Sequence, residues 1–89
     1  MDYAIFKKIG DAEKMKHINE SGICIAERKY KCFRIELYQV ENYYTEVYYY
    51  ADLDTIQLVW PFNHLDDLEP YLQQIDISSL QLHLGFHNN

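Results

Sequence analysis

The chain has 89 residues, of which 48% are hydrophobic and 16% are aromatic, and its formal net charge is −6. A chain of this length forms one small domain, and its composition is that of a globular protein rather than a disordered one. The negative charge argues against binding to duplex nucleic acid or to an anionic membrane surface, because either partner requires a basic patch.

The sequence has no evident segment that would take it into or across a membrane. Its apolar runs fall far short of the roughly 20 residues that a spanning helix needs. The start, Met1-Asp2-Tyr3, lacks the basic region and apolar core of a signal peptide. We therefore expect a cytoplasmic protein. So small a domain buries little surface, and we expect a homodimer or a complex with another protein.

The range 1–21 is predicted to contain two short helices separated by Gly10. Asp11 is a suitable N-cap for the second helix, which is expected to end at Ser21-Gly22 because glycine commonly stops a helix. The first helix is indicated by three apolar residues that would share one helical face: Ile5, Phe6 and Ile9.

Hydrophobicity alternates with a period of two over residues 22–62, which predicts β-strands. Pro61 falls at the end of the last strand, where a missing N–H costs least. Asn42 tolerates the positive φ that a tight hairpin requires. Three turns divide the range into the four strands of an antiparallel meander: Lys29-Tyr30-Lys31, Glu41-Asn42 and Asp52-Leu53-Asp54.

The same periodicity predicts which side chains the sheet buries. The buried face is expected to carry Ile23, Ile25, Phe33, Ile35, Leu37, Val47, Ile56, Leu58 and Trp60, together with Tyr43, Thr45 and Tyr49. The opposite face is expected to carry Arg34, Glu36, Tyr38, Tyr44, Glu46, Tyr48, Tyr50 and Gln57. The stretch 43–50 is only weakly amphipathic, and a slip of one residue would exchange the two sets.

A last helix is predicted over residues 63–75, with Asn63 as its cap and Pro70 as a kink or break. Residues 76–89 are expected to form a tail. The fold class is therefore α+β. A four-stranded antiparallel meander is flanked by short N-terminal helices and by a C-terminal helix, and the helices cover one face of the sheet.

No catalytic group, metal site or cofactor is predicted. His83 and His87 have a spacing that could bind a metal on a helix, but no carboxylate or cysteine lies near them in the sequence. Cys24 and Cys32 are not expected to face each other across the hairpin, so no disulfide is expected. Neither cysteine has a histidine partner implied by its spacing, as a nucleophile would need.

Acidic residues on the outer face admit two interpretations. Glu36 and Glu46 could form a close pair of the kind that serves acid–base chemistry. Arg28 and Arg34 on the same predicted face favour the simpler interpretation, a cross-strand charge network. Only three glycines occur, and they are scattered, so no phosphate-binding loop is predicted.

The outer face of the sheet is the main candidate for a binding surface. A monomer rarely leaves so much aromatic surface in water, and tyrosine and arginine are enriched at interfaces. The tyrosines could equally be plain strand formers. They could also stack on single-stranded RNA, although the acidic balance counts against this. The six candidate interface residues are Arg34, Tyr38, Tyr44, Glu46, Tyr48 and Tyr50.

We therefore predict a non-enzymatic domain that self-associates or binds another protein through its tyrosine-rich sheet face. The alternative is a small-ligand-binding or enzymatic domain with a cleft between sheet and helices. The residues expected to line such a cleft are Trp60, Tyr49, His64 and Asp66.

Four segments carry a wider pattern: Gly22-Ile23-Cys24-Ile25-Ala26-Glu27-Arg28, Leu37-Tyr38, Tyr43-Tyr44-Thr45-Glu46-Val47-Tyr48-Tyr49 and residues 56–62. The pattern resembles that of a group of small bacterial proteins of unknown function, and it covers about half of the chain. Asn42 and Thr45 stand where the group has Gly and an apolar residue. The resemblance implies a strand meander and no particular activity.

Overall fold

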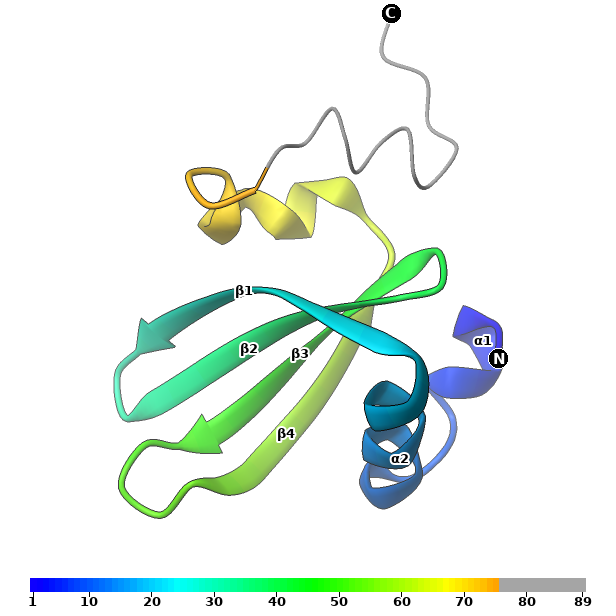
Figure 1. The fold of residues 1–89 in the computed structure, drawn as a ribbon, viewed down its shortest axis with the longest axis horizontal. Coiled ribbons are helices and arrows are strands. Elements are labelled where there is room, and N and C mark those ends of the chain that lie inside the picture. The colour runs from blue at the N-terminus through cyan, green and yellow to red at the C-terminus, as the bar shows by residue number, and fades with distance from the viewer. Residues whose placement is uncertain (76–89) are drawn as a thin grey trace, which may run out of the picture.

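A computed structural model describes residues 1–75; the predicted tail and the pair His83 and His87 lie outside the described residues. Figure 1 shows a twisted antiparallel sheet with helical segments before and after it. The four strands follow one another in the order β1-β2-β3-β4, which confirms the predicted meander. The elements are α1 (Tyr3–Phe6), α2 (Asp11–Ser21), β1 (Gly22–Tyr30), β2 (Phe33–Val40), β3 (Tyr43–Tyr50), β4 (Thr55–Phe62) and the 3₁₀ helix η1 (Leu65–Tyr71).

The hairpin turns differ in detail from the prediction. The first turn lies later in the chain than predicted, because Tyr30 is still paired with Phe33. The second turn lies at Glu41 and Asn42 as predicted, but the positive φ belongs to Glu41, at 55°, and not to Asn42. Lys31 and Asp54 also have positive φ, at 54° each. With no glycine in any turn, ordinary residues accept the left-handed conformation that tight hairpins require.

The facing of β3 is opposite to the prediction relative to β2. The two-residue turn pairs Val40 with Tyr43, and this register places Glu46 opposite Leu37. Directly opposed residues of an antiparallel pair share a face, so one set of β3 side chains lies with Leu37 rather than away from it. The residues of that set are Tyr44, Glu46, Tyr48 and Tyr50.

Both faces of the sheet contribute to the core. On one side, which we call the α face, the sheet packs against Phe6 of α1 and Ile18 of α2. The buried sheet residues of the α face are Val40, Tyr43, Val47 and Val59. On the other side, which we call the η1 face, the sheet packs against Leu68 and Tyr71 of η1. The buried sheet residues of the η1 face are Ala26, Leu37, Tyr44 and Phe62.

The helices therefore do not share one face, as the sequence led us to expect. The segment before the sheet covers the α face, and the segment after it crosses the η1 face (Figure 1). Both layers are thin, since the helical segments are short. None of the helices in residues 1–75 is long and apolar enough to cross a membrane.

The segment after the sheet is a 3₁₀ helix over Leu65–Tyr71 and not the predicted α-helix over 63–75. Pro70 lies inside it and lacks the N–H that either helix type would use at this position, so it interrupts the backbone hydrogen bonds there. Side chains three residues apart eclipse each other in a 3₁₀ helix. Leu68 and Tyr71 have this spacing, and both are completely buried.

Irregularities in the edge strands change which side chains share a face. Tyr48 pairs with Leu58 while Tyr49 pairs with Ile56, so Gln57 is the extra residue of a β-bulge. Ile56 therefore lies on the α face, and Leu58 lies on the η1 face. The prediction that these two residues share a face is wrong, because the bulge shifts the alternation by one residue.

Candidate functional site

The six residues predicted to form one interface lie on two opposite faces. Arg34 and Tyr38 belong to the α face, since they alternate with Ile35 and Leu37 along β2. The other four belong to the η1 face: Tyr44, Glu46, Tyr48 and Tyr50. The prediction of one contiguous tyrosine surface is therefore wrong, because its residues are divided between the α face and the η1 face.

On the α face, Arg34 is the centre of a charge network. Its guanidinium donates hydrogen bonds to Glu36, at 2.7 Å, and to Asp54, at 2.5 Å. It also lies 4.3 Å from the ring centroid of Tyr49, a cation–π distance. The Tyr38 hydroxyl donates to the other oxygen of Glu36 at 2.8 Å, and burial together with this bond raises the pKa of Tyr38.

On the η1 face, Glu46 holds three elements together. Its side chain is buried, and Oε2 accepts hydrogen bonds from the Tyr71 hydroxyl at 2.6 Å and from Arg28 Nη2 at 3.1 Å. Oε1 accepts from the Tyr48 hydroxyl at 3.4 Å. Burial is the main cause that raises the pKa of Tyr71, and its bond to Glu46 adds to it. The carboxylate thus joins β1, β3 and η1.

The two arginine–glutamate pairs confirm the predicted charge pairing in part. The pairs are Arg34–Glu36 and Arg28–Glu46, and the structure places them on opposite faces rather than in one network. The guanidinium of Arg28 also lies over the Tyr71 ring, 5.4 Å from its centroid. Removing one partner of a buried ion pair is costly in free energy. A structural role is therefore the simplest explanation of the buried Glu46 carboxylate.

Tyr44 is a core residue. Only 1% of its surface is exposed, and its ring stacks on Phe62 with centroids 5.6 Å apart. Burial raises its pKa to about 12. Its hydroxyl has no hydrogen-bond partner among residues 1–75. Tyr44 and Glu46 therefore cannot serve as an open interface while η1 covers them.

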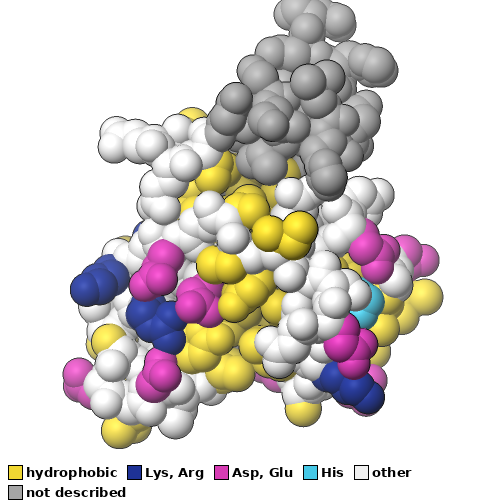
Figure 2. Space-filling model, viewed as in Figure 1, with side chains coloured by type: hydrophobic (Ala, Val, Ile, Leu, Met, Phe, Trp, Pro, Cys, Tyr) yellow, Lys and Arg dark blue, Asp and Glu magenta, His cyan; other side chains and the backbone are white. Residues whose placement is uncertain are grey.

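Exposed apolar surface concentrates instead on β4. Trp60 is 53% exposed, Leu58 40% and Ile56 44%, all within one strand of eight residues. Leu58 lies opposite Tyr48 on the η1 face, beyond the part that η1 covers. Figure 2 shows hydrophobic side chains gathered across the middle of the molecule, with basic and acidic side chains grouped beside them.

The exposed part of the η1 face forms what we call the aromatic patch. The ring of Phe33 lies edge-on to Tyr48, 5.8 Å between centroids, and 5.2 Å from the ring of Tyr50. Leu58 and Trp60 continue this surface to the edge of the sheet, since they are paired with β3 residues of the same face. The patch consists of Phe33, Tyr48, Tyr50, Leu58 and Trp60.

A groove of about 380 Å³ runs beside β4. It is lined by Tyr3, Lys7 and Lys14 from the helical side and by Leu58, Val59, Trp60 and Pro61 from the strand. Side chains of a strand alternate between its two faces. Four successive residues can line one groove only where it follows the outer edge of the strand. The groove therefore follows the outer edge of β4, where Leu58 and Trp60 are about half exposed and Val59 is 3% exposed.

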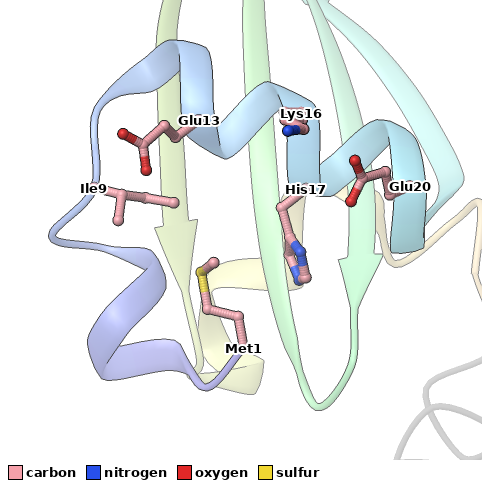
Figure 3. Close-up of a pocket in the computed structure, with 6 residues that line it drawn as sticks. All are labelled: Met1, Ile9, Glu13, Lys16, His17 and Glu20. Carbon is pink, nitrogen blue, oxygen red and sulfur yellow. The ribbon is translucent and has the colours of Figure 1, made fainter.

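A second hollow lies over α2 near the N-terminus (Figure 3). It has a volume of about 320 Å³ and is lined by Met1, Ile9, Glu13, Lys16, His17 and Glu20. The terminal amine of Met1 donates to Glu41 Oε1 at 2.6 Å, and His17 Nε2 lies 3.3 Å from the same oxygen. The amine is the main cause that lowers the pKa of Glu41. These contacts attach α2 and the N-terminus to the turn between β2 and β3.

The cleft expected for a ligand-binding domain is not assembled. Trp60 is paired with Glu46 and lies on the η1 face, whereas Tyr49 is paired with Ile56 and lies on the α face. His64 is exposed, and Asp66 lines a shallow hollow of about 410 Å³ on the outer side of η1. Within residues 1–75, no three His, Cys, Asp or Glu side chains gather closely enough to hold a metal ion.

The cysteines are both free and exposed. Burial of part of the side chain and the nearby charge of Glu36 raise the pKa of Cys24. A raised pKa keeps the sulfur as a thiol, which is the unreactive form. Neither cysteine has a hydrogen bond to a histidine within the described part of the chain.

Comparison with known protein families, with curated proteins and with solved structures finds no match for this chain. The resemblance to small bacterial proteins of unknown function therefore stays a prediction. The sequence predicts only Tyr48 and Tyr50 of the aromatic patch, because its alternation places the apolar residues of β4 on the buried face. The signal that could have found it is the absence of any charged residue between Thr55 and Phe62.

Proposed function

We propose that the protein is a non-enzymatic interaction domain that self-associates through the aromatic patch and β4. The observation that carries the proposal is the half-exposed pair of Leu58 and Trp60 on an edge strand without charge. Edge strands of soluble domains usually carry charged residues or other features that prevent pairing with another chain. Large aromatic side chains are also enriched where proteins bind one another.

The chemistry of the patch favours a protein surface as its partner over a small polar ligand. The patch contains no carboxylate or basic side chain of its own, and Glu46 beside it is already bonded to Arg28 and Tyr71. Tyrosine and tryptophan can cover a partner at little cost in side-chain entropy, because few torsions must be fixed. Non-directional apolar contact is therefore what the patch offers.

The size of the patch indicates a reversible complex. Full burial of a large apolar side chain contributes roughly 1.5–3 kcal/mol, and Leu58 and Trp60 are already about half buried. Two copies would gain a few kcal/mol from these residues, against an association cost of several kcal/mol. The aromatic rings beside them must supply the rest, so we expect dissociation on dilution.

The experiment is a measurement of solution mass by light scattering over a concentration series. The wild-type mass should rise from monomer to dimer, and Trp60→Ser should shift this transition at least about tenfold toward higher concentration (1.4 kcal/mol). Leu72→Ser is the matched control, because Leu72 is 49% exposed but follows the last residue of η1 and does not line the groove beside β4. Circular dichroism should show the same fold for all three proteins.

Two results would contradict the proposal. One is a wild-type protein that stays monomeric at every concentration. The other is a Trp60→Ser variant that associates like the wild type while Leu72→Ser also does so. Both substitutions replace exposed side chains, so neither is expected to prevent folding.

A further inference from the structure

We propose that the dimer forms by edge-to-edge pairing, with β4 of one copy antiparallel to β4 of the second copy. The inference rests on the proposed self-association and adds its geometry. The sheet of one copy would continue into the sheet of the other across a two-fold axis. Such an interface is isologous, so it closes at two copies and does not build a fibre.

The opposite edge of the sheet is already blocked. The side-chain amide of Gln74 acts there as a substitute for a neighbouring strand. Its Nε2 donates to the backbone oxygen of Glu27 at 2.8 Å, and its Oε1 accepts from the backbone N–H of Glu27 at 3.2 Å. The same stretch of β1 carries the charged residues Arg28 and Lys29. Strand pairing along β1 would have to break both bonds of Gln74.

The edge of β4 has none of these protections within residues 1–75. No backbone or side-chain group of the described part of the chain forms a hydrogen bond to its outer edge. The strand Thr55–Phe62 contains no charged residue. Leu58, Val59, Trp60 and Pro61 line the groove beside it; the side chains of Leu58 and Trp60 are about half exposed, whereas Val59 is 3% exposed.

Two interruptions of β4 define the register. The bulge at Gln57 disrupts regular pairing on one side, and Pro61 lacks an N–H on the other side. Val59 lies midway between them. A two-fold axis at Val59 would place Leu58 of each copy opposite Trp60 of the other, which forms two aliphatic–aromatic cross-strand pairs on the η1 face. The edge of β4 is therefore complementary to itself, and a second copy of the chain can pair with it.

The parity of the backbone agrees with this register. A proline in a strand is found where its nitrogen faces the open side of an edge strand. Val59 and Pro61 are two residues apart within one regular stretch of strand pairing, in which Val59 is opposite Val47 and Pro61 is opposite Thr45. Their backbone N and C=O groups therefore point to the same side of the strand. The N–H and C=O of Val59 therefore point outward. They would exchange two hydrogen bonds with Val59 of the second copy.

Charge complementarity also favours the antiparallel arrangement. The ring of Tyr3 packs on Tyr43, the first residue of β3, which places α1 and Lys7 at the Phe62 end of β4. The turn at the Thr55 end carries Asp52 and Asp54, of which Asp54 is bonded to Arg34. Antiparallel pairing brings the acidic turn of one copy to the end of the shared sheet that carries Lys7 of the other. A parallel arrangement would bring like charges together at each end.

The test is amide hydrogen exchange of the wild-type protein, followed residue by residue at concentrations below and above the dimer transition. The amide of Val59 should exchange about tenfold more slowly when the dimer outnumbers the monomer tenfold. The amide of Glu27, bonded to Gln74 within each copy, should not respond to concentration and serves as the control.

Each outcome decides between the proposals. Slowing at Val59 on dimerisation supports the edge-paired dimer. A dimer in which Val59 exchanges as fast as in the monomer overturns edge pairing and leaves self-association through the patch standing. A monomer at all concentrations removes both proposals. A monomer whose Val59 amide is already protected also overturns the inference, because the edge would then be covered within one chain.

Discussion

Two tyrosine hydroxyls at the η1 face show that similar residues can have opposite energetic roles. The Tyr71 hydroxyl donates to the buried carboxylate of Glu46 at 2.6 Å. The Tyr44 hydroxyl is also buried, but it has no partner among residues 1–75. A hydrogen bond to a charged group contributes about 1.5–3 kcal/mol, whereas a buried polar group without a partner costs free energy.

Replacement of each hydroxyl should therefore change stability in different directions. Tyr71→Phe is expected to lower the free energy of unfolding by about 1.5–3 kcal/mol, since Glu46 loses its shortest hydrogen bond. Tyr44→Phe keeps the ring stacked on Phe62 and is expected to be neutral, or to stabilise by up to about 1 kcal/mol. Urea unfolding of both variants measures the difference. Equal destabilisation by the two substitutions would contradict these roles.

At the scale of the elements, the junction of α2 and β1 depends on the absence of a side chain. Gly22 caps α2 with φ of −87°, a value that any residue adopts, so its backbone conformation does not require glycine. A Cβ atom at this position would lie 2.7 Å from the backbone oxygen of Ile18. The constraint is therefore steric, and it involves backbone that cannot rotate away.

Gly22→Ala is expected to destabilise the protein by about 1–3 kcal/mol, because the last turn of α2 must shift. Gly10→Ala is the matched control, since nothing lies within 4 Å of a Cβ at Gly10. Gly10 is the N-cap of α2, and not Asp11 as the sequence led us to expect. The loss of a good N-cap residue and the reduced freedom of the unfolded chain roughly cancel there, to within about 0.5 kcal/mol. Thermal unfolding compares the two variants. A larger loss for Gly10→Ala than for Gly22→Ala would refute the steric explanation.

The existence and order of the elements follow from local signals in the sequence. The face of the sheet on which each side chain lies does not. Alternation and turn residues predicted four strands, and Gly22 predicted the end of α2. The facing of β3 depended on one number, the length of the turn at Glu41 and Asn42. Five tyrosines in β3 fit either face, because each has an apolar ring and a polar hydroxyl. A pattern of residue types therefore cannot separate Tyr44 in the core from Tyr48 at the surface.

Only part of the candidate site could be predicted from the sequence. Tyrosine-rich surface was expected, and Tyr48 and Tyr50 are indeed partly exposed on one face. Burial of Glu46 was not predictable, since it requires Arg28 from β1 and Tyr71 from η1 to meet on it. Exposure of Trp60 was not predictable either. Its apolar character and alternation are those of a core residue, and only its place on the edge strand leaves it uncovered.

At the scale of the whole molecule, the two edges of the sheet differ in how well they are protected against pairing with another chain. One edge is occupied by Gln74 and carries charge, whereas the strand at the other edge has no charged residue and is bordered by a groove over residues 58–61. A net charge of −6 makes two copies repel each other at long range. Association therefore has to be driven by short-range contacts, and the contacts available on the open edge are those of Leu58 and Trp60.

The cross-strand pairs of the proposed dimer can be replaced by charges of chosen sign. Leu58→Lys with Trp60→Lys should prevent dimerisation, because each lysine would face a lysine of the second copy. Leu58→Glu with Trp60→Glu should prevent it for the same reason, since like charges directly opposite each other destabilise a strand pair. Both variants alter exposed side chains and should keep the monomer fold.

A mixture of the two variants should form a heterodimer. In it, the two lysines of one chain would face the two glutamates of the other, so both cross-strand pairs become attractive. Light scattering of the separate and mixed variants, in low salt, measures this rescue, which should weaken as salt is added. If the mixture stays monomeric under conditions where the wild type dimerises, Leu58 and Trp60 do not face each other across the interface, and the register centred on Val59 is wrong.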